Sequence, residues 1–541
     1  MSTQKKNFIL PIIVMFALFF MIAFVTNFAG SMGVIVQNQF GATPAMAQLG
    51  TLANFIAYAC MGIPAGIILR RKGYKFTSLL AVTVGFIGVG IQFLSGYAES
   101  FPVYVTGAFV AGFSMCLLNI VVNPMLNTLG GGGNKGNQLI QLGGSLNSVG
   151  GTLAPILLGY LIGGNVEVAS VSDAAPAMII AMAIFALAFV IIVLTKIPEP
   201  HMETAEEKAA RKAGNKVKDK YSPLSFRHFV LGAVAIFFYV GIEVGIPNIA
   251  NLYMTTPTME QAEKTIADYE AQTAAEVVAE AAETEAVETE SVAEDIIAEA
   301  VEATKLSEAE AAEPAVVAVE EADTTATEAT KPEAHIATIA VEEAEASAEV
   351  AEAKPISKKA YEKAKDVVTG KAKAGRGMSA STAGTLVGIY WFLMMIGRLI
   401  GGAIGGRVSS KAMLTAVSAL AMALVAAFIY TPESAVISVS FIEGAVPMGI
   451  AILFLCGLCT SVMWGGIFNL AAEGLGKYTA AASGIFMALV CGGGIIPFLQ
   501  GLLVDSTSYL GSYWLIFACL GYLLFYALVG SKNVNKDIKT E

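Results

Sequence analysis

The chain alternates between long apolar runs and short polar stretches over most of its length. Each apolar run holds about 20 residues, which lets an α-helix cross a hydrocarbon core of roughly 30 Å. The runs are Phe8–Val36, Ala45–Leu69, Phe76–Ser95, Val103–Met125, Leu139–Gly163, Ala175–Leu194, Phe229–Tyr253, Ala380–Ile404, Ala412–Ile429, Ala445–Ala471, Thr479–Leu503 and Tyr513–Val529. We therefore predict an all-α integral membrane protein with twelve transmembrane helices in two pseudo-symmetric six-helix bundles.

Basic residues occupy every second loop between these runs. They lie at the N-terminus and after the second, fourth, sixth, eighth, tenth and twelfth runs. The short loops after the first, third, fifth, ninth and eleventh runs contain no Lys or Arg. Since loops rich in Lys and Arg stay on the cytoplasmic side, we expect a multi-pass protein with both termini in the cytoplasm.

The composition indicates a membrane protein whose acidic residues are concentrated in one segment. Only 14% of the residues are charged, against roughly 25% in soluble domains, which excludes an ordinary soluble enzyme. Residues Pro257–Ser379 hold 29 of the 44 acidic and 11 of the 33 basic residues. This stretch is rich in Ala and Glu and has no wide apolar stripe, so we predict an acidic low-complexity extracytoplasmic insertion that transport does not need. A segment that binds a partner or captures a ligand is the alternative.

These features divide the chain into five parts. We predict an N-terminal six-helix bundle (1–196), a cytoplasmic linker (197–227), helix 7 (228–256), the insertion (257–379) and helices 8 to 12 (380–541). The motif Gly151-x-x-x-Pro155-x-x-x-Gly159 in helix 5 recurs in helix 11, where Gly493, Pro497 and Gly501 take the same places. This recurrence is typical of the duplicated halves of a transporter.

Polar side chains inside the predicted spans indicate where a solute binds. They are costly in lipid, so they face other helices or a wet cavity. Amides and aromatic rings suit a neutral polyhydroxylated ligand that offers hydroxyl groups and an apolar ring face. We predict the substrate-binding residues Asn27, Asn119, Asn123, Gln141, Asn147, Tyr239, Asn248, Trp391, Trp464 and Asn469. For any one amide, hydrogen bonding between helices is the alternative.

Glu243 is the only carboxylate well inside a predicted span, and the first six spans contain none. A carboxyl group in that position is a candidate for carrying the coupled proton. An ion pair with Arg398, or a bond to a backbone group, is the structural alternative.

Other chemistries lack their residues. The sequence contains no P-loop and no GxSxG nucleophile elbow, which excludes ATP-driven pumping and hydrolase chemistry. The histidines His201, His228 and His335 are scattered, so we predict no metal site, no cofactor and no enzymatic activity.

Several segments carry a likeness to a known family. They are Gly66–Lys75 after helix 2, Asn123-Pro124 in helix 4, Phe237–Val244 in helix 7, Glu473–Thr479 after helix 10 and Pro497–Gly501 in helix 11. With these segments the chain resembles the fucose/galactose/glucose:proton symporters, of which the L-fucose permeases are typical, within the major facilitator superfamily. The resemblance implies a V-shaped pair of six-helix bundles that hold a sugar between them and work by alternating access.

The resemblance also implies an acidic residue on helix 1 and another on helix 4, and this chain has neither. Helix 1 has no acid, and Asn119 stands where the acid of helix 4 would be. On helix 5 the family's Gln and Asn match only in Asn147, because Gly144 replaces the Gln.

We therefore expect a secondary active transporter that moves a hexose-like sugar of the fucose, glucose or galactose type across the cell inner membrane by proton symport. The alternatives are a facilitator, a sodium-coupled carrier of another small solute, or a non-transporting membrane sensor. The expected partners are the sugar, a proton as coupling ion and the lipid bilayer, with no nucleic acid, and we expect a monomer.

Overall fold

The structure is a computed structural model that describes residues 9–130, 133–162, 171–199, 202, 221–279, 356–404, 407–440, 442, 444–475 and 478–534. The chain divides into two compact units. The first comprises Met1–Ala262 and Lys363–Glu541, and the second comprises Glu263–Glu362. Residues 280–355 of the predicted insertion and residues 203–220 of the predicted linker lie outside the described part.

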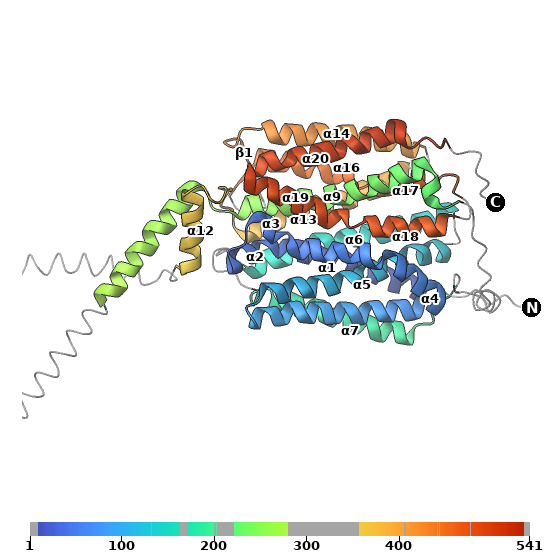
Figure 1. The fold of residues 1–541 in the computed structure, drawn as a ribbon, viewed down its shortest axis with the longest axis horizontal. Coiled ribbons are helices and arrows are strands. Elements are labelled where there is room, and N and C mark those ends of the chain that lie inside the picture. Colours follow the sequence, from blue (N-terminus) through green and yellow to red (C-terminus); the bar gives the residue numbers. More distant parts are fainter. Residues whose placement is uncertain are drawn as a thin grey trace, which may run out of the picture. The chain divides into compact units, whose positions relative to one another are not determined.

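Helices that run side by side build the first unit (Figure 1). The helices of the first half are α1 (Ile9–Ser31), α2 (Gly33–Phe40), α3 (Pro44–Ala47), α4 (Leu49–Tyr97), α5 (Phe101–Leu129), α6 (Gly133–Ile162) and α7 (Ala175–Leu194). Those of the second half are η2 (Pro223–Ser225), α9 (Arg227–Thr255), α13 (Ala380–Ile404), α14 (Ser410–Tyr430), α15 (Met448–Phe454), α16 (Cys456–Thr460), α17 (Met463–Ala472), α18 (Thr479–Leu489), α19 (Gly492–Ser506), α20 (Tyr509–Phe525) and the π-helical turn η4 (Tyr526–Gly530).

The described residues contain eleven helical segments that are long and apolar enough to span a membrane. One of them, α4, has 49 residues, which at about 1.5 Å per residue is more than twice the thickness of a hydrocarbon core. Gly73 interrupts it with φ 85° and ψ 176°, a conformation that glycine adopts without strain. The parts before and after Gly73 correspond to the second and third predicted spans, and each of the twelve predicted runs overlaps a helix.

The turn at Gly73 is fastened to the end of α7. The carboxylate of Glu199 accepts hydrogen bonds from the backbone N–H groups of Tyr74 and Lys75, the latter at 2.9 Å. These N–H groups begin a helix and have no partner within it, so the carboxylate caps them. The Lys75 Nζ donates to the carbonyls of Val193 at 2.7 Å and Thr195 at 3.1 Å.

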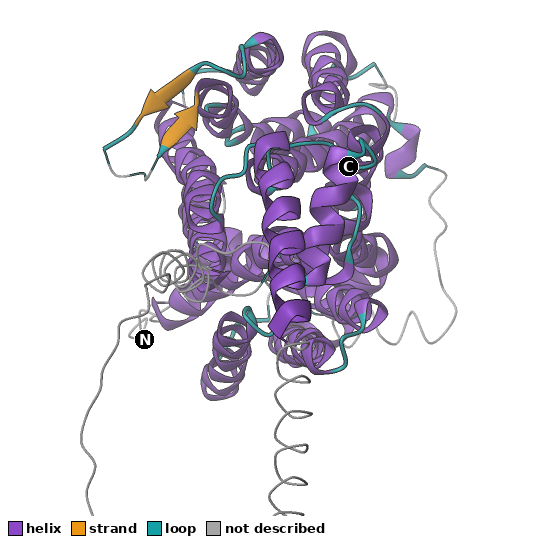
Figure 2. Ribbon diagram, turned by 90° about the vertical axis from the view of Figure 1, so that its left-hand side faces the viewer, coloured by secondary structure: helices purple, strands orange, loops and turns teal. Residues whose placement is uncertain are grey.

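A short antiparallel ribbon corrects one predicted boundary. Strand β1 (Val436–Ser438) pairs with strand β2 (Ala445–Pro447), and Figure 2 shows both at the margin of the helices. The prediction that a helix begins at Ala445 is therefore wrong, because α15 begins at Met448. Pro447 explains the shift, since a proline disfavours helical backbone in the residue before it.

The two copies of the glycine–proline motif make equivalent contacts. The copy in α6 packs against α13, and the copy in α19 packs against α3 and α4 (Figure 1). A Cβ atom on Gly159 would collide with the carbonyl of Ala380, and one on Gly501 would collide with the backbone of Ala45. Each copy therefore uses a missing side chain to bring its helix against the opposite half.

The described residues of the second unit are 263–279 and 356–362, which belong to the acidic stretch. Within it, the rings of Tyr269 and Tyr361 stack with centroids 4.5 Å apart. The Gln272 side chain accepts a hydrogen bond from the Ile356 N–H at 2.9 Å. Helix α12 (Lys358–Val368) begins in this unit.

Candidate functional site

An ion pair lies in the interior of the first unit. Glu243 sits midway along α9, and Arg398 belongs to α13. The Arg398 Nη2 lies 3.4 Å from the Glu243 Oε1, and the two side chains are 12% and 14% exposed. Among the charged residues of the described membrane-spanning helices, these two alone lie well away from helix ends and from the break at Gly73.

Arg398 also reaches across to the first half of the molecule. Its Nη1 donates to the Gly144 carbonyl at 2.5 Å, to the Ser148 Oγ at 3.0 Å and to the Asn147 Oδ1 at 3.5 Å. Arg398 lies directly beside Gly144, because a Cβ placed there would make an ordinary contact with the Arg398 Cδ and Nη1 at 3.7 Å. The guanidinium therefore joins α9, α13 and α6.

Aromatic side chains surround the pair. The Tyr390 hydroxyl donates to the backbone carbonyl of Glu243 at 3.2 Å and lies 3.3 Å from the Thr460 hydroxyl. Tyr239, one turn before Glu243 on α9, is fully buried, and its ring centroid lies 6.1 Å from that of Trp464. These rings surround the pair with apolar surface from the second half.

Trp391 extends the cluster to α1. Its ring lies edge-to-face with Tyr390 at 5.5 Å. A Cβ on Gly151 would lie 3.0 Å from the Trp391 ring and 3.2 Å from the Asn27 amide nitrogen, so these two predicted residues meet at Gly151. Asn147 is tied to the same helix, because its Nδ2 donates to the Phe19 carbonyl at 2.9 Å. The structure therefore gathers Asn27, Asn147, Tyr239, Glu243, Trp391 and Trp464 along one continuous chain of contacts.

The two asparagines of α5 form a separate group. The Asn119 Nδ2 donates to the Tyr58 hydroxyl at 3.0 Å and to the Met115 carbonyl at 3.1 Å. The Asn123 Nδ2 donates to the Asn119 carbonyl at 3.1 Å. These bonds stay within the first half, and both side chains keep partial exposure.

Asn248 lies nearer the end of the helices that carries α2 and α3, which we call the α3 end (left in Figure 1). Its Nδ2 donates to the Gln48 Oε1 at 3.2 Å and to the Thr51 Oγ1 at 3.4 Å. A Cβ on Gly30 would lie 2.6 Å from the Asn248 Oδ1. Asn248 thus joins the second half to two helices of the first.

The remaining two predicted residues stand apart from this chain of contacts. The Gln141 Nε2 lies 3.6 Å from the place of a Cβ on Gly465 in α17. Asn469, also on α17, has an exposed side chain.

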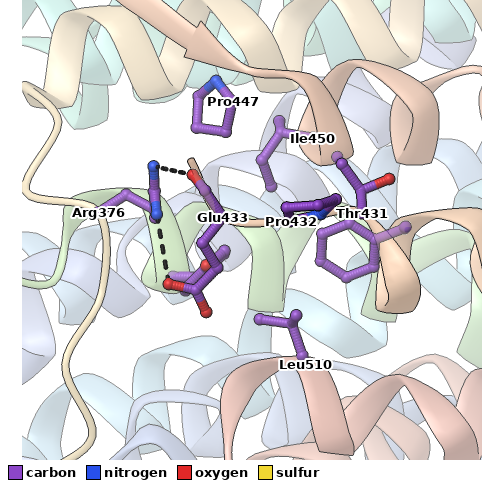
Figure 3. A pocket seen from close by; sticks show the side chains of 10 residues that line it. Arg376, Thr431, Pro432, Glu433, Pro447, Ile450 and Leu510 are labelled. Atoms are coloured by element: carbon purple, nitrogen blue, oxygen red, sulfur yellow. Dashed lines mark hydrogen bonds and ion pairs between the residues drawn. The ribbon is translucent and has the colours of Figure 1, made fainter. Parts of the chain in front are cut away.

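A hollow at the α3 end contains a second ion pair, shown in Figure 3. The Arg376 Nη1 lies 3.4 Å from the Glu433 Oε2, and its Nη2 donates to the Glu433 carbonyl at 2.8 Å. The Glu433 side chain is 62% exposed. This pair has the same charges and separation as Glu243 and Arg398, but it lies within the second half near solvent.

Comparisons with known proteins agree with this arrangement of helices. The family model of the Major Facilitator Superfamily matches residues 14–274. A glucose/galactose transporter of Brucella abortus (biovar 1, strain 9-941) is 22% identical over 98% of this chain and 97% of its own length. The crystal structure of the E. coli fucose:proton symporter superposes with a TM-score of 0.54 at 16% identity, over 98% of this chain and 100% of that chain. The chain has the major facilitator fold. An L-fucose-proton symporter of Escherichia coli (strain K12) is 24% identical over 44% of this chain and 58% of its own length, so the resemblance to the sugar symporters of this superfamily is confirmed.

Sequence reasoning missed part of the cluster. Arg398 was left out of the predicted binding residues, although a lone arginine in an apolar span is itself a functional signal. Ser148 and Tyr390 were not predicted as site residues. Serine hydroxyls in helices commonly bond their own backbone, so Ser148 did not indicate a site. Gln48, which receives the Asn248 amide, lies before the start of α4 and was not considered.

Proposed function

We propose that this chain is a secondary transporter that moves a hexose-like sugar across the inner membrane by alternating access, with proton symport through Glu243. The observation that carries the proposal is the Glu243–Arg398 pair of the second half, whose guanidinium also bonds to α6 of the first half. The relatives support the substrate, since they are a glucose/galactose transporter and an L-fucose-proton symporter.

The contacts suit such a cycle. The amides Asn27 and Asn147 and the Trp391 ring lie beside the pair and offer a sugar hydrogen bonds and an apolar face. At the α3 end, the bonds from Asn248 to Gln48 and Thr51 close the two halves upon each other. With both termini in the cytoplasm the α3 end faces outward, so this arrangement is the state closed to the exterior.

Transport by purified protein in liposomes tests the proposal. We expect uptake of labelled D-glucose, D-galactose or L-fucose, with accumulation when the outside is more acidic than the lumen. Absence of uptake across a broad panel of monosaccharides would refute the proposal that the substrate is a sugar.

A facilitator is the second candidate, because the described spans of the first half hold no carboxylate away from their ends. A facilitator only equilibrates its solute, so a pH gradient would leave the final sugar level unchanged. A sodium-coupled carrier would instead accumulate sugar in response to a sodium gradient.

A further inference from the structure

The charge balance of the spans constrains the substrate. Glu243 and Arg398 are each other's counter-ion, and the described spans hold no other carboxylate at mid-depth; Asp505 lies at the end of α19. The titratable groups that act on Glu243 are Tyr239 on its own helix and Arg398 and Tyr390 on α13. When a proton neutralises Glu243, the guanidinium of Arg398 therefore loses the one anion that lies near it among the described residues.

An unpaired guanidinium at this depth is costly. Removing one partner of a buried ion pair destabilises a protein strongly, because the other charge stays in a low dielectric. The Gly144 carbonyl and the Ser148 hydroxyl contribute dipoles but no charge. A neutral sugar cannot supply the missing charge, so a cycle that protonates Glu243 and carries only neutral sugar leaves this cost in place.

A carboxylate on the substrate removes the cost. The planar guanidinium presents its N–H groups as a fork that matches a carboxylate, and such paired bonds are strong. The bond to Glu243 is a single contact of 3.4 Å, long for a charged hydrogen bond. Both side chains keep some exposure, which gives a ligand access to the pair.

We propose that Arg398 binds a carboxylate of the transported sugar, so that the substrates include sugar acids of the hexuronate class. The proton on Glu243 and the carboxylate on Arg398 enter together: the proton breaks the internal ion pair, and the substrate restores it. The amides of Asn27 and Asn147 then serve the sugar hydroxyls. This inference rests on the proposed function, because it assumes that the chain transports a sugar.

The test compares D-glucuronate with D-glucose on the purified full-length protein. Binding is measured by tryptophan fluorescence and thermal shift, and transport by labelled uptake and by electrical recording from proteoliposomes. We expect D-glucuronate to bind more tightly as the pH falls and to move without net charge, because one proton accompanies one anion. D-glucose carried with a proton moves one positive charge.

Two variants and a control locate the site. Arg398→Gln should weaken D-glucuronate binding by roughly 10- to 100-fold, the effect of losing a charged hydrogen bond, and weaken D-glucose binding much less. Arg398→Lys keeps the charge but lacks the paired N–H donors of the guanidinium, so it should retain part of the D-glucuronate binding. It replaces the Gln variant in the test if that variant does not fold. Arg376→Gln, which removes the ion pair with Glu433, should leave the binding of both ligands unaffected.

The outcomes separate this inference from the proposed function. Transport of D-glucose with no binding or transport of D-glucuronate overturns the inference and leaves sugar transport standing. D-glucuronate binding that is unchanged by pH, or unchanged in both Arg398 variants, also overturns it. Failure to move either sugar refutes the proposed function itself.

Discussion

The two halves of the bundle share a backbone plan and differ in their charges. Both carry the glycine–proline motif, and both use it to approach the opposite half closely. The second half supplies Glu243 and Arg398, whereas the first half contributes carbonyls, amides and hydroxyls to the same cluster. Glycines thus determine how closely the halves pack, whereas the charged residues Glu243 and Arg398 of the second half determine the chemistry of the interface.

The largest expected effect is the loss of coupling in Glu243→Gln. This change keeps the shape of the side chain and removes its titration, so the variant should exchange sugar but no longer accumulate it against a gradient. Labelled uptake under an imposed pH gradient measures this. The control is Glu433→Gln, which alters the ion pair of the same separation near solvent. Equal accumulation by the parent and by Glu243→Gln would make Glu243 a structural residue.

A large side chain at the contact between the halves should cost stability and transport together. A Cβ on Gly384 of α13 would collide with the Pro155 carbonyl of α6. Gly384→Val should therefore lower the free energy of unfolding by about 1–3 kcal/mol, the usual cost of overpacking. Thermal unfolding in detergent checks this. Gly402→Val on the same helix is the control, because no heavy atom lies within 4 Å of a Cβ there. Equal losses in both variants would contradict the packing argument.

Removing the amide of Asn248 should loosen the α3 end. Asn248→Ala deletes two hydrogen bonds between the halves, each with a net value of about 1 kcal/mol. The population open at this end should rise roughly 5- to 30-fold. A cysteine introduced at Ala47, which is buried and takes no part in these two bonds, reports this change through its rate of labelling with an impermeant maleimide.

Asn119→Ala is the matched control for that experiment, since the bonds of Asn119 stay within the first half. Its labelling rate should equal that of the parent. An unchanged rate in Asn248→Ala would show that this amide does not hold the halves together.

The smallest effect should follow from replacing the acidic unit Glu263–Glu362 with a short flexible linker. This unit clusters separately from the transmembrane helices, and its composition does not build an apolar core. Sugar uptake should stay within about twofold of the parent. The replacement keeps Arg376, whose ion pair with Glu433 would be lost if all of Pro257–Ser379 were removed. A large loss of uptake in a stable, inserted variant would show that the acidic unit takes part in transport.

Much of the fold was predictable, since apolar runs and loop charges reflect the cost of burying polar groups in lipid. The boundary at Ala445 failed because hydropathy does not distinguish a short apolar strand from the start of a helix. Glu243 and Asn147 were recognisable as polar residues in apolar spans. Their partners were less so, because the contact between Arg398 and the Gly144 carbonyl joins residues 254 positions apart. No local pattern encodes such a pairing.

The cap on the turn at Gly73 has a consequence for the connection between the halves. Because Glu199 is bonded to the backbone of Tyr74 and Lys75, the connecting chain leaves the first half only after residue 199. It rejoins the second half at η2, which begins at Pro223. At about 3.3 Å per residue this tether can extend to roughly 80 Å, far more than the roughly 30 Å thickness of a hydrocarbon core. The number of residues in this connection is therefore large enough that its maximum length sets no limit on the rocking of the two halves.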